Sequence, residues 1–106
     1  MSPSQIYIAS DHAGFEFKAA VVDYLKSKSL KVKDLGCDST ESVHYPDYAH
    51  KLCKELLADT SADARGILIC GTGIGMSITA NRYKGIRAAL CHSSDYARLS
   101  REHNDS

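Results

Sequence analysis

Short apolar runs alternate along the chain with longer stretches in which apolar residues recur at helical spacing. The apolar runs predict strands at Ile6–Ser10, Gly66–Cys70 and Ile86–Cys91, and alternating polar and apolar residues predict another at Lys31–Leu35. Helical spacing predicts four helices, from about Gly14 to Ser27, from Asp47 to about Asp59, from the glycine-rich loop after Cys70 to about Asn81, and from Ser93 or Ser94 onward. This alternation is typical of a parallel α/β sheet with right-handed crossovers.

Two of the predicted helices carry a distinct apolar face. The face of the first consists of Phe17, Val21, Tyr24 and Leu25, at i, i+4, i+7 and i+8. The second follows Pro46, which ends any preceding helix, and Asp47, which is a good N-cap. Its expected inward residues are Ala49, Leu52, Cys53, Leu56 and Leu57.

The composition fits a single globular domain over residues 1–106, with 43% hydrophobic and 25% charged residues. Thirteen basic and thirteen acidic residues cancel, so no overall field attracts nucleic acid or an anionic membrane. The first residues lack the pattern of a signal peptide, and no stretch is apolar enough to span a membrane. We therefore expect a cytoplasmic protein. Backbone amides and one or two cations could still hold a phosphate locally.

In parallel sheets of this kind, ligands bind beyond the carboxyl ends of the strands. This rule selects three groups of residues as candidates for a site. They are Ser10–His12 after the first predicted strand, Cys70–Gly75 after the third, and His92 with its neighbours after the fourth.

The stretch from Cys70 to Ser77 is the most informative. Gly71, Gly73 and Gly75 let the backbone turn sharply and approach a ligand, and their amides can converge on negative charge. The spacing is not that of a dinucleotide-binding loop, which would read G-x-G-x-x-G. A purely structural turn between strand and helix stays open as the alternative.

Cys70 stands apart from the other three cysteines, Cys37, Cys53 and Cys91. The four form no C-x-x-C pair and have no histidine at zinc-ligand spacing, which argues against a metal site and a disulfide framework. A buried, inert thiol is the default interpretation for each. At the end of a central strand and the start of a helix, however, a thiolate is stabilised and could act as nucleophile or general base.

The other candidates allow a structural and a functional interpretation. Asp11 and His12 could orient a sugar hydroxyl and a phosphate, or Asp11 could simply cap the following helix. His103 shares a helical face with Tyr96 and Leu99, where packing is the usual role. Packing is also the default for Tyr45, which precedes Pro46.

Several motifs occur together and in order along the chain. They are Asp11-His-Ala-Gly14, Tyr45-Pro-Asp-Tyr-Ala49, Gly66-Ile-Leu-Ile-Cys-Gly-Thr-Gly-Ile-Gly-Met-Ser77, Asn81, Gly85-Ile-Arg-Ala88 and Arg101-Glu-His-Asn-Asp105. Over essentially its whole length, the chain thereby resembles type B ribose-5-phosphate isomerases and the related galactose-6-phosphate isomerases.

This resemblance implies a Rossmann-like three-layer α/β/α sandwich and interconversion of ribose 5-phosphate with ribulose 5-phosphate. Cys70 would remove the proton from C2 to give an enediolate and return it at C1. The loop residues Gly71, Thr72, Gly73, Ile74 and Gly75 would hold the enediolate oxygens, with Thr72 beside the reacting atoms.

The resemblance also assigns roles outside this loop. His103 would help to open the furanose ring and Asp11 would assist, while His12 would contact the phosphate, and Tyr45 and Asn104 would line the sugar site. It implies no metal and no cofactor. It further implies a homo-oligomer, a dimer or a dimer of dimers, with active sites built across the subunit interface.

Members of this family extend beyond Ser106, so we expect the chain to lack the family's C-terminal strand, its interface helix and its phosphate-binding arginines. A truncated sequence and a natural short paralogue both fit. We hypothesise that the isolated chain is weakly active at best. The alternatives are a non-catalytic sugar-phosphate-binding subunit, a galactose-6-phosphate isomerase and, more remotely, a nucleotide-binding module. Preference for pentose or hexose phosphate stays open.

Overall fold

The computed structural model describes residues 3–37, 45–61, 63–104 and 106 of the chain. In chain order, the elements are β1 (Ile6–Ser10), α1 (Phe15–Ser27), β2 (Val32–Asp34), α2 (Tyr45–Ala58), β3 (Arg65–Ile69), α3 (Ile74–Asn81) and α4 (Ser94–Asn104). Residues 38–44, which precede α2, lie outside the described residues.

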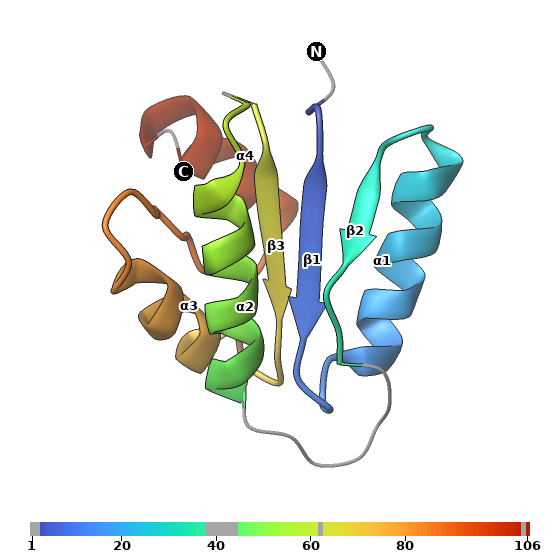
Figure 1. Ribbon diagram of the computed structural model, residues 1–106, viewed down its shortest axis with the longest axis horizontal. Coiled ribbons are helices and arrows are strands. Elements are labelled where there is room, and N and C mark those ends of the chain that lie inside the picture. Colours follow the sequence, from blue (N-terminus) through green and yellow to red (C-terminus); the bar gives the residue numbers. More distant parts are fainter. Residues whose placement is uncertain (1–2, 38–44, 62, 105) are drawn as a thin grey trace.

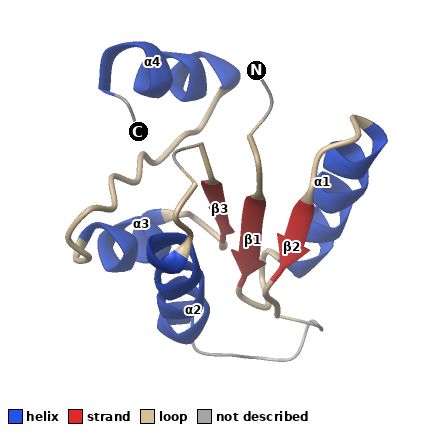
Figure 2. Ribbon diagram, turned by 45° about the horizontal axis from the view of Figure 1, so that its top comes forward, coloured by secondary structure: helices blue, strands red, loops and turns tan. Residues whose placement is uncertain are grey.

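The three strands form a parallel sheet in the order β2–β1–β3, so β1 is central (Figure 1). Ile6 pairs with Val32 of β2 and with Arg65 of β3. Helices cover both faces of this sheet: α1 packs on one, and α2, with α3 alongside it, on the other (Figure 2). The predicted Rossmann-like α/β/α arrangement is confirmed.

The core lies between α2 and the sheet. Tyr7, Ala9, Leu35 and Leu52 are buried there, and partly buried apolar residues close its edges. On β3, Gly66 faces α2 at very short range, because a Cβ at this position would lie 2.8 Å from Leu52 Cδ2. The missing side chain lets α2 pack closely on β1 and β3.

The prediction of a fourth strand at residues 86–91 is wrong. This segment is irregular, and the described part of the sheet has three strands. Asn81 explains the difference: its Nδ2 donates to the Ala88 carbonyl at 2.8 Å, and its Oδ1 accepts the Ala88 amide at 2.9 Å. The side chain takes the place of a neighbouring strand and holds the segment beside α3.

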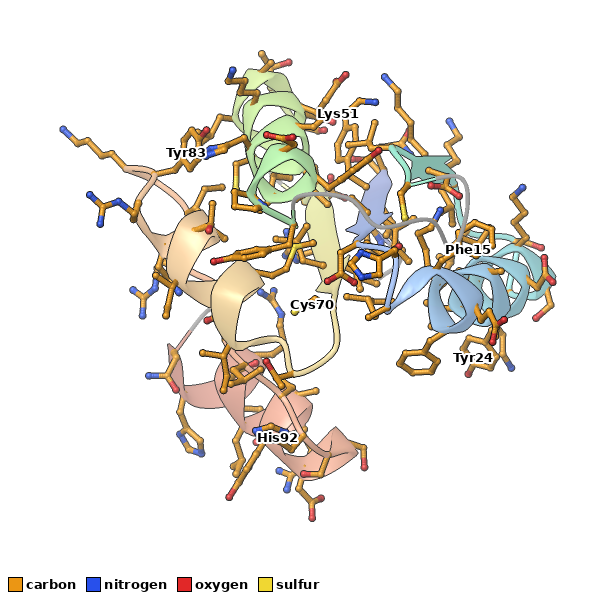
Figure 3. All side chains as sticks on the ribbon, turned by 90° about the horizontal axis from the view of Figure 1, so that it is seen from below. Phe15, Tyr24, Lys51, Cys70, Tyr83 and His92 are labelled. Atoms are coloured by element: carbon orange, nitrogen blue, oxygen red, sulfur yellow. The ribbon has the colours of Figure 1, made fainter. Side chains whose placement is uncertain are left out.

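The predicted apolar face of α1 is also wrong in part. Phe17 is 65% exposed and Tyr24 61%, whereas Lys18 and Val22 are buried. Figure 3 shows the Tyr24 ring on the outer side of α1. Lys18 can face inward because its ammonium group pairs with both carboxylate oxygens of Asp34, each at 2.7 Å. The paired cation therefore lies where hydrophobic periodicity placed aromatic rings.

The predictions for the other helices fare better. In α2, Ala49, Leu52 and Cys53 are buried as expected, while Leu57 is 47% exposed. The last helix begins where its cap was expected, since the Tyr96 amide donates to Ser93 Oγ at 3.2 Å. However, α4 packs against no other helix or strand of the described chain and buries none of its residues. None of the described helices is long and apolar enough to cross a membrane.

A polar contact closes the amino-terminal edge of the core. The Tyr7 hydroxyl donates to Asp59 Oδ2 at 2.6 Å, and Asp59 Oδ1 accepts the Ser61 amide at 2.8 Å. The hydrogen bond to Asp59, together with burial, raises the pKa of Tyr7 to about 12. The hydrogen bonds from Ser61 and Tyr7 hold the pKa of the Asp59 carboxyl below its usual range. The contact ties β1 to the end of α2.

We expect Leu52→Ala to lower the free energy of unfolding by about 2–5 kcal/mol, because Leu52 is 3% exposed and its loss leaves a cavity. The matched control is Leu57→Ala on the same helix, which should cost less than about 1 kcal/mol. Urea titration measures both. Equal losses for the two variants would contradict the placement of the core.

Tyr7→Phe should destabilise the fold in a way that depends on pH. The raised pKa of Tyr7 means that the folded state favours the protonated phenol. Its contribution is therefore complete below the ordinary tyrosine pKa of 10.0 and is lost as the pH rises towards about 12. In urea titrations, the stability difference between the unaltered protein and Tyr7→Phe should be larger at about pH 8 than at about pH 11. The same difference at both pH values would refute the assignment.

Candidate active site

The loops that follow β1 and β3 meet at the carboxyl edge of the sheet. A Cβ built on Gly71 would lie 3.8 Å from the Ala13 Cβ, which is ordinary van der Waals contact. A Cβ on Gly14 would lie 2.7 Å from Ile69 Cγ2 and 2.8 Å from the Ile69 carbonyl oxygen. Only glycine fits at position 14, and this close approach brings the start of α1 against the end of β3.

Cys70 follows β3 directly and lies at this junction, half-buried (Figure 3). Its Sγ accepts a hydrogen bond from the Gly73 amide at 2.9 Å. Gly73 is the N-cap of α3, so the sulfur lies at the positive end of a helix as well as facing a donor. The Cys70 sulfur is thus held in place by the loop that follows it.

The glycine loop is held in shape by two further contacts. The Thr72 hydroxyl accepts the Ile74 amide at 3.2 Å, which leaves its own proton to donate to another group. Gly73 has a left-handed backbone with φ 81°, and Leu90 covers it so closely that a Cβ would lie 2.4 Å from Leu90 Cδ1. Leu90 is a site residue that sequence reasoning missed, and no local pattern indicates its contact with the loop.

Asp11 is buried at the end of β1. Its Oδ1 accepts the Gly14 amide at 3.0 Å, and its own amide donates to the Ile69 carbonyl at 3.1 Å. Asp11 thus holds the turn before α1, but it does not cap this helix: Gly14 is the N-cap, and no side chain caps it. Its amide binds Ile69, the residue before Cys70, so this structural role places Asp11 at the candidate site.

His12 and Tyr45 approach the site from two sides. His12 is half-buried in the turn between Asp11 and Gly14. Tyr45 begins α2 and lies against the third loop glycine: a Cβ on Gly75 would be 2.6 Å from Tyr45 Cε1 and 3.1 Å from its hydroxyl oxygen. The packing expected for Tyr45 is therefore packing against the glycine-rich loop.

His103 and Asn104 are not brought to this site within one chain. Both are exposed at the end of α4. This helix lies toward the amino ends of the strands, whereas Cys70 follows their carboxyl ends (Figure 1). His92, the candidate after the absent fourth strand, is also exposed and lies farther out beside α4 (Figure 3).

The remaining cysteines lie in different surroundings. Cys37 and Cys53 are buried, as the default interpretation expected, and burial raises the pKa of the Cys53 thiol. Cys91 is instead exposed. Cys70 is the half-buried cysteine, at a position that solvent and a ligand can reach.

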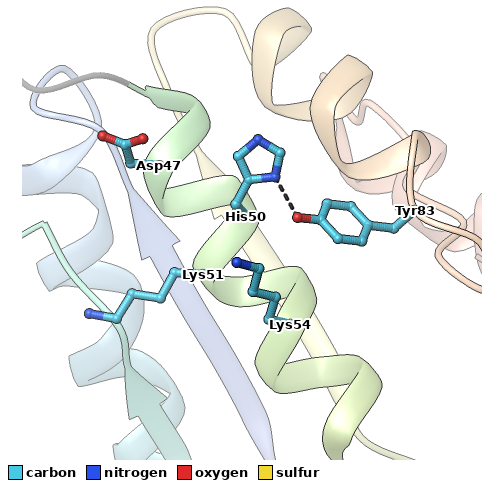
Figure 4. A pocket seen from close by; sticks show the side chains of 5 residues that line it. All are labelled: Asp47, His50, Lys51, Lys54 and Tyr83. Carbon is cyan, nitrogen blue, oxygen red and sulfur yellow. Dashed lines mark hydrogen bonds between the residues drawn. The ribbon is translucent and has the colours of Figure 1, made fainter.

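An open depression lies on the outer side of α2 (Figure 4). Its lining consists of Asp47, His50, Lys51, Lys54 and Tyr83, and it includes none of the candidates named above. His50 Nδ1 and the Tyr83 hydroxyl share a hydrogen bond that ties α2 to the segment after α3. Within the described ranges, no three or more His, Cys, Asp or Glu side chains gather as a metal site would require.

Residues 6–106 match the model of the Ribose/Galactose Isomerase family. The chain belongs to this family. Ribose-5-phosphate isomerase B of Escherichia coli is 44% identical over 101 residues, which are 95% of this chain and 66% of that protein.

Solved structures agree with this membership of the Ribose/Galactose Isomerase family. The crystal structure of a ribose 5-phosphate isomerase from Thermotoga maritima matches with a TM-score of 0.91 and 55% identity, covering 97% of this chain and 70% of that one. Ribose-5-phosphate isomerase B of Mycoplasma genitalium, solved with bound ribulose-5-phosphate, matches with a TM-score of 0.90 and 40% identity, covering 96% and 67%. The chain spans about two thirds of the length of these relatives.

Gly73→Ala should disturb the site more than Gly71→Ala. At Gly73, an alanine must adopt a left-handed backbone, which costs about 1–2 kcal/mol, and must displace Leu90. At Gly71, the added methyl group meets only ordinary contact with Ala13. We expect lower thermal stability and slower alkylation of Cys70 in Gly73→Ala, with little change in Gly71→Ala. Mass spectrometry of the Cys70 peptide measures alkylation, and equal rates in the two variants would contradict the loop geometry.

Proposed function

We propose that the protein interconverts ribose 5-phosphate and ribulose 5-phosphate, with Cys70 as the general base. The observation that carries this proposal is the position of Cys70, with its sulfur on the Gly73 amide and the Asp11–His12 turn beside it. The name of the Escherichia coli relative and the ribulose-5-phosphate bound to the Mycoplasma genitalium protein support the choice of substrate.

In the proposed reaction, the Cys70 thiolate takes the proton from C2 of the open-chain aldose. The electrons of the broken C–H bond form the C1–C2 double bond, and negative charge moves to the C1 oxygen. The thiol then returns the proton to C1, while the proton of the C2 hydroxyl passes to the C1 oxygen and C2 becomes the ketone. A positioned base of this kind contributes about 10²–10⁴-fold in rate.

The loop residues have separate tasks in this mechanism. The Gly73 amide faces the sulfur, so it holds the base, and other amides between Gly71 and Gly75 hold the enediolate oxygens. Thr72 directs its hydroxyl proton to a substrate oxygen, because its lone pair already accepts the Ile74 amide. Ile74 lies at the start of α3, where the helix favours negative charge.

The residues around the loop bind the rest of the sugar phosphate. Asp11 handles the ring oxygen or a hydroxyl, and His12 contacts the phosphate. Tyr45, whose ring rests against Gly75, lines the sugar site.

His103 and Asn104 act from a neighbouring subunit in this proposal. His103 assists ring opening and Asn104 lines the sugar. Their helix, α4, packs on no other described element and exposes Tyr96 and Leu99, which suits a helix that is buried in an oligomer. A dimer, or a dimer of dimers, would supply the partner.

One observation favours a second candidate, a sugar-phosphate-binding protein without turnover. Within one chain, His103 does not reach Cys70, so ring opening lacks its assistant unless a partner provides it. Binding without turnover would raise the melting temperature in ribose 5-phosphate while the isomerase assay stays silent. The same two measurements with galactose 6-phosphate would decide between pentose and hexose.

The test of the primary proposal is Cys70→Ala in a coupled assay of ribose 5-phosphate isomerisation. Loss of the base should lower kcat by at least about 10²-fold. Cys91→Ala is the matched control, because its thiol is exposed and lies outside the site. It should keep full activity. Unchanged turnover in Cys70→Ala would exclude the thiol as base.

A further inference from the structure

A buried lysine lies behind the candidate active site. Lys18 is 2% exposed in the first half of α1, and its Nζ lies 2.7 Å from both carboxylate oxygens of Asp34, at the end of β2. Burying an ammonium group is costly unless it is paired, and an apolar side chain of similar length would fill the same space without that cost. The position of Lys18 therefore calls for a role besides packing.

Hydrogen bonds connect Asp34 to the end of β1. Its Oδ1, besides pairing with Lys18, accepts the Gly36 amide at 2.9 Å. The Gly36 carbonyl in turn accepts the Ser10 amide at 2.8 Å, and the Cys37 amide donates to the Ser10 carbonyl at 3.0 Å. The turn after β2 is thereby clamped to the last residue of β1.

From Ser10, the same series of contacts reaches the catalytic cysteine. Asp11 follows Ser10, donates its amide to the Ile69 carbonyl at 3.1 Å and accepts the Gly14 amide on its carboxylate at 3.0 Å. Ile69 directly precedes Cys70. A path of hydrogen bonds, joined by the covalent steps from Ser10 to Asp11 and from Ile69 to Cys70, thus runs from the Lys18 ammonium across all three strands to the candidate base.

We propose that Lys18 is a positioning residue: through Asp34 and the Gly36 turn it fixes the relative placement of Asp11 and Cys70. The proposal rests on the function proposed above. The Lys18 ammonium pairs with Asp34 and not with the proposed base, so it acts through the alignment of the strand ends. Errors of about 1 Å in such alignment cost up to about 10²-fold in rate.

The test compares Lys18→Met with Lys33→Met. Methionine keeps the length and apolar stem of Lys18, and the Asp34 side chain, 41% exposed, can return to water when its partner is lost. The control breaks the exposed ion pair of Lys33 and Glu55, whose charged atoms are 3.4 Å apart. Lys33 precedes Asp34 on β2, but its pair is not part of the path to Cys70. Both variants are assayed well below their melting temperatures.

We expect Lys18→Met to lower kcat for ribose 5-phosphate by about 10- to 100-fold, with KM changed by less than about 3-fold. Lys33→Met should leave both within about 2-fold. Lys18→Arg, which keeps the cation, should recover part of kcat. A purely structural lysine would change the melting temperature without changing kcat of the folded protein, and that outcome would overturn the proposal.

Amide hydrogen exchange separates this proposal from the proposed function. The Ser10, Asp11 and Cys37 amides should exchange faster in Lys18→Met than in Lys33→Met, whether or not the protein turns over ribose 5-phosphate. Unchanged exchange overturns the role of Lys18. If Lys18→Met fails to fold, Asp34→Asn replaces it, because the amide keeps an acceptor for Lys18 and removes the charge. Asp34→Asn should show a smaller loss of kcat and a smaller increase in the exchange of the same amides. If neither changes, the proposal is overturned.

Discussion

The hydrogen bond from the Asp11 amide to the Ile69 carbonyl, at 3.1 Å, is the interaction on which the candidate site depends. It extends the β1–β3 ladder, in which Ser10 pairs with Ile69, one step beyond the end of β1. The chain therefore cannot leave β1 without passing beside the residue that precedes Cys70. The absent side chain of Gly14 then lets α1 start against Ile69 itself. Two short loops are brought together by the strands from which they emerge.

The sequence could predict most of this fold because strands and helices have different periods. Three of four strands, all four helices and the parallel arrangement follow from apolar runs and helical spacing alone. The failures depend on side chains that replace or override such patterns. Asn81 hydrogen-bonds the Ala88 backbone in place of a fourth strand, and Asp34 neutralises Lys18 so that Phe17 is left outside. Both are pairings between particular side chains, which periodicity does not register.

The residues of the candidate site also fall into those that the sequence could predict and those that it could not place. Cys70, Asp11 and the glycine-rich loop could be predicted because parallel strands all end at one edge, and the structure brings these residues together. Tyr45 joins them through its contact with Gly75, across a distance in sequence that no local motif spans. His103 could be placed on a helix, but its distance from Cys70 depends on how that helix packs, and periodicity contains no information on packing partners.

The separation of Cys70 from His103 within one chain fits the chemistry of the proposed reaction. Proton transfer at carbon requires the base and the oxyanion donors to be held in fixed positions. In the proposed reaction these groups belong to Cys70 and to the loop that follows β3, while the buried ion pair of Lys18 and Asp34 holds the turn after β2. Ring opening precedes that step. It breaks the bond between C1 and the ring oxygen, and its proton moves between oxygen atoms, so its assistant needs to reach the substrate rather than be built into the same core. A helix such as α4, which carries His103 and leaves Tyr96 and Leu99 exposed, can serve this second task from a neighbouring subunit. The rigid edge of the sheet and the separate helix thus correspond to the two stages of the proposed reaction.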